Sequence, residues 1–146
     1  MRVYLDNCCY NRPYDDQTQL RISLESQAKL AIQARIKNGD IELATSYMTF
    51  FENSENPYDM RRKNIRAFQE KNATVHLSAE SDEAVNQKAV EIGATGIKYK
   101  DACHVACAIY TESDYLLTTD DRLLKYETDE VKIMNPIEFI QETEED

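Results

Sequence analysis

Hydrophobic and polar positions follow two different periods along the chain, and the change between them predicts the order of strands and helices. Short apolar runs predict five strands, at residues 2–5, 41–45, 74–77, 114–118 and 131–134. Apolar residues at steps of three and four predict helices at residues 18–37, 58–71, 81–92, 99–110, 120–126 and 136–141. A further helix is expected between the N-cap Ser46 and Pro57.

This alternation favours an α/β fold of three layers, α/β/α, around a central, mainly parallel five-stranded sheet. With three glycines and no low-complexity linker, residues 1–141 are expected to form one domain. Residues 142–146 are expected to form an acidic C-terminal tail. We predict a loop from Asn11 to Asp16, because a proline and paired acids resist regular structure.

Composition narrows the functional classes. The 146 residues are 42% hydrophobic and 30% charged, as in folded proteins. No apolar run approaches the roughly 18 residues that cross a bilayer, and the N-terminus does not resemble a signal peptide, so we expect a cytoplasmic protein without a membrane partner. The net charge of −10 argues against tight non-specific nucleic-acid binding, but not against metal-dependent phosphodiester chemistry.

Four acids stand where parallel α/β folds place their sites. Asp6 ends the first predicted strand and Asp120 the fourth, while Glu52 and Asp101 lie on helices after the second strand and before the fourth. Taken singly, each acid also has a purely structural explanation, because acids are common in turns and at the N-termini of helices. Together they would repel one another unless a divalent cation neutralised them, and Mg²⁺ or Mn²⁺ suits such oxygen-rich sites.

At these positions the sequence resembles the PIN-domain family. The matching segments, in the order of that family's four acidic motifs, are Leu5-Asp6-Asn7, Ser46 followed six residues later by Glu52, Lys100-Asp101-Ala102-Cys103-His104-Val105-Ala106, and Leu117-Thr118-Thr119-Asp120-Asp121. The stretch from Asn7 to Asp16 is unlike the apolar helix start of the family's toxins and is similar to a separate subgroup of PIN-like proteins.

The resemblance implies a metal-dependent endoribonuclease that uses Mg²⁺ or Mn²⁺ to hydrolyse RNA phosphodiester bonds. It implies that Asp6, Glu52, Asp101 and Asp120 are catalytic and metal-binding, that Asp121 is an optional fifth ligand, and that Thr118 provides a hydroxyl beside the last acid. An antitoxin-like protein partner and a homodimer are the assemblies it implies, and Tyr47, Phe50 and Phe51 are candidates for an apolar contact patch.

Basic and polar residues supply candidate contacts to RNA. Arg62 and Arg66 share one face of the basic helix, which also carries Arg61 and Lys63. This face is either solvated or follows phosphates. We add Arg12, Asn7, Ser46 and Thr118 to Arg62 and Arg66 as the predicted substrate-binding residues.

Cys103, His104 and Cys107 stand close together in the sequence, as the ligands of a zinc site can. Cys103 and Cys107 share a helix face, but His104 points about 100° away from Cys103 and no second cysteine pair follows. Burial in the core explains these residues better, and His76, within a short strand, is expected to be structural.

Two other functional classes stay open. One is a catalytically silent module that binds RNA or a protein partner. The other is a phosphoryl-transfer domain, which needs paired acids at the end of the first strand, where only Asp6 stands.

Overall fold

A sheet of five parallel strands runs through the centre of the computed structural model, which describes residues 1–144. The strands are β1 (Arg2–Leu5), β2 (Glu42–Ser46), β3 (Ala73–Leu77), β4 (Tyr115–Leu117) and β5 (Lys132–Met134). Their order is β3-β2-β1-β4-β5, and every neighbouring pair is parallel. The N-terminal strand is therefore the central one.

Helices connect the strands. They are α1 (Asn7–Asn11), α2 (Leu20–Lys37), α3 (Tyr47–Ser54), α4 (Asp59–Asn72), α5 (Asp82–Gly93), α6 (Tyr99–Tyr110), α7 (Asp121–Leu124) and α8 (Pro136–Thr143). Two 3₁₀ turns, Arg12–Tyr14 and Ala79–Ser81, complete the described elements. The predicted α/β fold with a five-stranded parallel sheet is confirmed.

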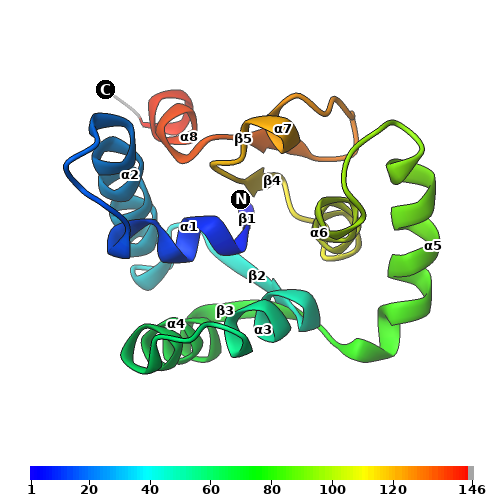
Figure 1. Ribbon diagram of the computed structural model, residues 1–146, viewed down its shortest axis with the longest axis horizontal. Helices are drawn as coiled ribbons and strands as arrows, with labels where there is room; N and C mark the ends of the chain where they lie inside the picture. The colour runs from blue at the N-terminus through cyan, green and yellow to red at the C-terminus, as the bar shows by residue number, and fades with distance from the viewer. Residues whose placement is uncertain (145–146) are drawn as a thin grey trace.

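Each face of the sheet packs against its own set of helices. Successive strand residues point to opposite faces, so Tyr4 and Leu116 face α5 and α6, whereas Val3, Leu5 and Leu117 face the other side. The second face is covered by α1, α2, α4 and α8, and it buries residues such as Ile32 and Phe139. In Figure 1, α2 and α8 lie to the left of the strands and α6 to the right, with α5 outside α6. The three layers follow directly from this division.

Residues 7–14 are helical, which corrects the loop predicted from Asn11 onward. The Asp6 carboxylate caps α1 by accepting the backbone N–H of Asn7, and the 3₁₀ turn begins directly after Asn11. Within this segment, the side chains of Cys9 and Tyr10 are fully buried against the core. Burial of their apolar surface outweighs the weak helix preference of the local sequence, because helices in proteins draw most of their stability from packing.

Helix α2 buries two charged side chains. Glu25 is fully buried and accepts hydrogen bonds from Arg12 Nε at 2.9 Å, from Arg21 Nε at 3.2 Å and from the Asn135 amide. Lys29 is also buried, and its ammonium donates to Gln33 Oε1 at 2.6 Å. Burial lowers the pKa of Lys29 to about 8.

The C-terminal helix α8 extends to Thr143, two residues beyond the predicted end of the domain at residue 141. Of the predicted tail, Glu145 and Asp146 lie outside the described residues. None of the helices in residues 1–144 is both long and apolar enough to cross a membrane.

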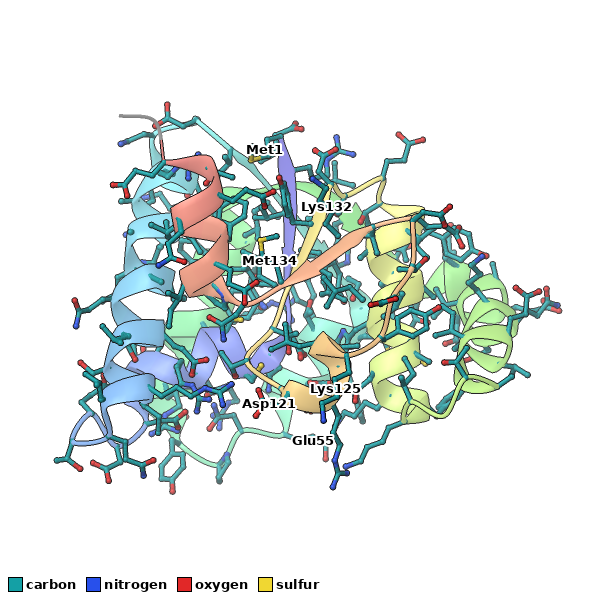
Figure 2. The ribbon with its side chains drawn as sticks, turned by 90° about the horizontal axis from the view of Figure 1, so that it is seen from above. Met1, Glu55, Asp121, Lys125, Lys132 and Met134 are labelled. Atoms are coloured by element: carbon teal, nitrogen blue, oxygen red, sulfur yellow. The ribbon has the colours of Figure 1, made fainter. Side chains whose placement is uncertain are left out.

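The parallel strands all point toward one edge of the molecule. Figure 2 shows Met1 and Lys132 near the end where β1 and β5 begin, and Asp121, Lys125 and Glu55 gathered at the opposite end. Side chains that follow β1, β2 and β4 therefore meet at the same edge.

Candidate metal and active site

Asp6 stands directly after β1 and is almost fully buried, with 7% of its surface exposed. Its Oδ1 accepts the backbone N–H of Asn7 at 2.8 Å, and its Oδ2 accepts the Thr118 hydroxyl at 2.8 Å. The Cys8 thiol lies 3.5 Å from Oδ2. These donors fix the carboxylate in one orientation, because hydrogen bonds to the charged form of a buried acid stabilise it.

Asp120 is positioned by the end of β4. Its backbone N–H donates to Thr118 Oγ1 at 3.1 Å, and its carboxylate caps α7 by accepting the Arg122 N–H at 2.9 Å. The same threonine hydroxyl thus contacts the carboxylate of Asp6 and the backbone of Asp120. Two acids separated by more than a hundred positions in the chain are held by one side chain.

Glu52 and His104 form a buried pair. The Nε2 of His104 lies 2.5 Å from Glu52 Oε1 and 3.9 Å from Asp6 Oδ1. Burial raises the pKa of Glu52, but the hydrogen bond and charge of His104 outweigh it, with help from Lys100, whose ammonium lies 3.8 Å away. Burial lowers the pKa of His104, but Glu52, Asp6 and Asp101 together raise it above its ordinary value.

A hydroxyl network lies behind this pair. The Tyr4 hydroxyl is 2.8 Å from His104 Nδ1 and 2.7 Å from Ser46 Oγ, and all three side chains are buried. Ser46 also caps α3 by accepting the N–H of Thr49 at 3.3 Å. The cap that starts α3, the helix carrying Glu52, is therefore linked through Tyr4 to the histidine that Glu52 contacts.

Asp101, in the first turn of α6, faces the same cluster. Its pKa is raised by burial and by the negative charges of Asp6 and Asp120, while His104 and Lys98 act in the opposite direction. The negative charges of Asp6 and Asp120 thus disfavour the ionised form of Asp101.

Asp121 lies outside the cluster. Its carboxylate forms a two-point ion pair with Arg21 of α2, at 2.8 and 3.0 Å, and this pair lowers its pKa. Arg21 also contacts Glu25, so Asp121 connects α7 to α2. Its role as an optional metal ligand stays a prediction that the geometry does not favour.

The basic side chains predicted to bind substrate are engaged within the fold. Arg12 pairs with Glu25 and with Asp15. Arg62 pairs with Asp59 and donates to the Asn56 carbonyl at 3.0 Å. Arg66 pairs with Glu70 and lies over the Phe50 ring, 3.7 Å from its centroid. Their substrate contacts stay predictions, and their charges are partly neutralised before any RNA arrives.

Three polar side chains named as substrate contacts support the site from within. Ser46 and Thr118 are fully buried, with hydroxyls directed to Tyr4 and to Asp6. Asn7 is half-buried and lies next to Asp6 at the start of α1. The structure gives the two hydroxyls a positioning role, while contact with substrate stays a prediction for all three.

His104 is the site residue that sequence reasoning missed. The signal was its spacing from Asp101, because residues three apart lie on the same face of a helix. It also stands within a run of seven buried positions, where an unpartnered imidazole would be costly. When zinc binding was considered, the direction of His104 was compared only with that of Cys103. Its position one helical turn after Asp101 was overlooked.

His76, Cys103 and Cys107 are not part of the carboxylate cluster, whereas the Cys8 thiol reaches Asp6 and Thr118. Cys103 and Cys107 are buried in the core beside α5, and His76 bonds Thr45 Oγ1 at 2.9 Å and stacks on Phe50. Within residues 1–144, the one group of three or more histidines, cysteines and acids close enough to share an ion is Asp6, Glu52 and His104.

The donor set fits a divalent cation. The ligand atoms of Asp6, Glu52 and His104 lie within 4.8 Å of one another, and Asp101 and Asp120 add negative charge around them. A divalent cation would relieve the repulsion that raises the pKa of Asp101. Carboxylate and imidazole groups are ligands that such ions accept in proteins.

Comparisons with known proteins add a likeness of fold. Neither a family model nor a curated protein matches the chain. Among solved structures, a chain of VapBC2 from Rickettsia felis, bound to a DNA fragment from their promoter, has a TM-score of 0.55 at 14% identity, and the match covers 92% of this chain and 98% of that one. A chain of FitAcB from Neisseria gonorrhoeae has a TM-score of 0.56 at 16% identity, over 92% and 97% of the two chains.

These comparisons correct the family expectation. Four acidic motifs suggested membership of the PIN-domain family, but no family model matches the chain. At identities of 14% and 16%, the two solved structures show a similar fold and nothing more. Short motifs at strand ends recur wherever a parallel sheet gathers acids at its carboxyl edge, so their order alone does not establish descent. A likeness of fold alone does not assign a function.

Proposed function

We propose that the chain is a metal-dependent endoribonuclease that hydrolyses RNA phosphodiester bonds at the carboxyl edge of its sheet. The observation that carries the proposal is the meeting of Asp6, Glu52 and His104, which come from three separate elements and place their ligand atoms within 4.8 Å of one another. Buried acids are costly unless they are neutralised, so a cluster of this kind points to a cation.

The chain's own residues would hold and orient the reacting groups. Asp6 and Glu52, with His104, Asp101 and Asp120 around them, would bind Mg²⁺ or Mn²⁺. When bound, such an ion orients and activates water and stabilises charge on a phosphate. Thr118 fixes the direction of Asp6, and Tyr4 fixes that of His104. Lys100, 62% exposed and beside Glu52, is placed to contact a phosphate that approaches the acids.

RNA is the substrate class proposed, and the acidic balance of the chain shapes how it would bind. With a net charge of −10, tight sequence-independent binding is not expected, and contact would concentrate on the few exposed cations around the site. Weak binding with local cleavage is consistent with such a surface.

The test is cleavage of unstructured single-stranded RNA by purified protein in Mn²⁺ or Mg²⁺, with chelator as blank. We expect cleavage by the native chain and by Asp129→Asn, because Asp129 is exposed and borders a hollow with Met1 at the opposite end of the sheet. We expect at least a hundredfold loss in Asp6→Asn. If the folded native chain cuts none of several RNAs with either ion, the proposal fails.

A second candidate is a catalytically silent module that binds RNA or an antitoxin-like protein partner. The pairing of Glu52 with His104 favours it, because the imidazole already neutralises one acid without an ion. This candidate expects RNA affinity, measured by fluorescence anisotropy, that is unchanged by chelator and by Asp6→Asn. Ion-dependent cleavage excludes it.

A further inference from the structure

An imidazole nitrogen projects into the carboxylate cluster. His104 Nε2 lies 2.5 Å from Glu52 Oε1 and 3.9 Å from Asp6 Oδ1, and the side chain is 1% exposed. The acids identified from the sequence would offer only oxygen ligands. The structure adds a nitrogen donor at their centre, and the choice of ion depends on the donor type.

The hydroxyl network can hold the imidazole in either neutral form. If the Tyr4 hydroxyl donates to Nδ1, then Nε2 carries the hydrogen and donates it to Glu52. If Nδ1 instead carries the hydrogen, it donates to Tyr4, whose own hydroxyl donates to Ser46 Oγ at 2.7 Å. Only hydrogens move between the two arrangements. The second leaves the Nε2 lone pair directed at the acids, and the hydrogen-bonded partner of a ring nitrogen decides which nitrogen can bind metal.

The short distance between His104 Nε2 and Glu52 Oε1 requires a hydrogen or a cation that both atoms can share. Two lone pairs cannot face each other at 2.5 Å, so a hydrogen occupies the gap in the ion-free state. A divalent cation can take the place of that hydrogen once the proton leaves Nε2 for solvent and the two ligand atoms move apart, while Nδ1 donates its own hydrogen to the Tyr4–Ser46 pair. Metal-binding histidines are commonly held in this way, with the second ring nitrogen donating to a fixed acceptor.

We propose that His104 Nε2 is a direct ligand of the ion, alongside Asp6 and Glu52, and that this mixed donor set makes the site select Mn²⁺ over Mg²⁺. Mg²⁺ favours oxygen ligands and retains its water, whereas first-row transition ions accept imidazole. The inference rests on the metal site of the proposed function, but it concerns the ligand and the identity of the ion, which can be measured without any RNA.

The decisive experiment is pulsed electron paramagnetic resonance on the native chain loaded with Mn²⁺. We expect ¹⁴N coupling from one directly bound imidazole, replaced by ¹⁵N coupling when the protein is made with ¹⁵N-labelled histidine. The chain has two histidines, so His76→Gln is the matched control and should keep the coupling. His104→Gln should lose it. By calorimetry, we expect Mn²⁺ to bind at least tenfold more tightly than Mg²⁺ in the native chain, and this ratio to fall in His104→Gln.

A second variant guards against misfolding of His104→Gln. Tyr4→Phe keeps the buried ring and removes only the hydroxyl that orients His104, so we expect about a tenfold loss of Mn²⁺ affinity with the nitrogen coupling retained. Mn²⁺ bound to the native chain without histidine coupling overturns the inference and leaves the nuclease proposal intact. Histidine coupling without RNA cleavage supports the inference and overturns the nuclease proposal. Absence of Mn²⁺ binding by the folded native chain overturns the inference, and absence of both Mn²⁺ and Mg²⁺ binding overturns the nuclease proposal as well.

Discussion

The hydroxyl of Thr118 donates to Asp6 Oδ2 across 2.8 Å and joins the ends of two neighbouring parallel strands. Leu5 and Leu117, the residues just before them, are register partners in β1 and β4. Because this pairing sets the distance between the two chain segments, the bond forms as a result of strand register. The direction of the central acid is thus fixed by the sheet itself.

Removing this hydroxyl tests its positioning role. In Thr118→Val, Asp6 loses one donor and the Asp120 N–H loses its acceptor, so we expect the free energy of unfolding to fall by about 1–3 kcal/mol. Mn²⁺ affinity should fall as well, about tenfold. Thr118→Ser retains the hydroxyl and should recover most of both quantities in urea unfolding and calorimetry. Equal values for the valine variant and the native chain would contradict the role.

Ion binding should stabilise the native fold. At a free Mn²⁺ concentration of 100 times the dissociation constant, one site that exists only in the folded state contributes about 2.7 kcal/mol. The melting temperature of the native chain and of Asp129→Asn should therefore rise on adding Mn²⁺ and return with chelator. Asp6→Asn should show no rise, and an equal rise in all three proteins would place the ion elsewhere.

The buried Glu25 should be among the most sensitive charged residues to substitution. Its carboxylate accepts from Arg12, Arg21 and Asn135, so Glu25→Gln leaves two guanidinium groups and a buried amide without their charged partner. We expect a loss of about 3 kcal/mol in the free energy of unfolding. Asp121→Asn, which removes an exposed partner of Arg21, should leave that energy nearly unchanged. Comparable losses in the two variants, measured by urea unfolding, would show that burial is not the cause.

Lys29 predicts how stability changes at alkaline pH. Its folded pKa of about 8 lies below the ordinary 10.5 because burial disfavours the charge, and Lys37 adds to that effect while Cys9 opposes it. Below pH 8 Lys29 is charged in the folded and the unfolded state, so burial of its charge lowers the free energy of unfolding by the full amount. Between pH 8 and 10.5 Lys29 is neutral in the folded chain but still protonated in the unfolded chain. The free energy of unfolding therefore rises with pH in this interval.

Replacing this lysine should therefore stabilise the protein at neutral pH. A shift of this size corresponds to about 3 kcal/mol, which loss of the contacts with Gln33 and the Tyr10 and Phe68 rings partly offsets. We expect Lys29→Met to gain about 2 kcal/mol at pH 7 and to lose the stability gain between pH 8 and 10.5. Lys71→Met, which replaces an exposed lysine of α4, is the control. Unfolding profiles of Lys29→Met that still rise in this interval would assign the effect to another group.

The sequence predicted the sheet well because its signals are local. Each strand is a short apolar run, and Asp6 and Asp120 follow such runs at the edge where parallel strands end. Placing acids at strand ends therefore needs only strand boundaries and the parallel rule. The helical course of residues 7–14 was missed because it depends on burial of Cys9 and Tyr10 under other elements.

The chemistry of the site was harder to predict, since it depends on contacts between distant positions. His104 stands in a run of small apolar residues, and only its meeting with Tyr4 and Glu52 shows its role. Arg12 appeared to be a free cation, because Glu25, thirteen positions later, gave no sign that it would be buried. Side-chain partners across elements are set by tertiary packing, which hydrophobic periodicity does not encode.

The central place of β1 governs when the carboxylate cluster can form during synthesis. During synthesis β1 leaves the ribosome before β4, its partner on one side, and more than a hundred residues separate the two strands. A nascent chain that stops before Thr118 contains Asp6, Glu52 and His104 but lacks the strand and hydroxyl that align Asp6. Chains that end before β4 should therefore lack an aligned Asp6, and the complete cluster should arise only after β4 has been translated.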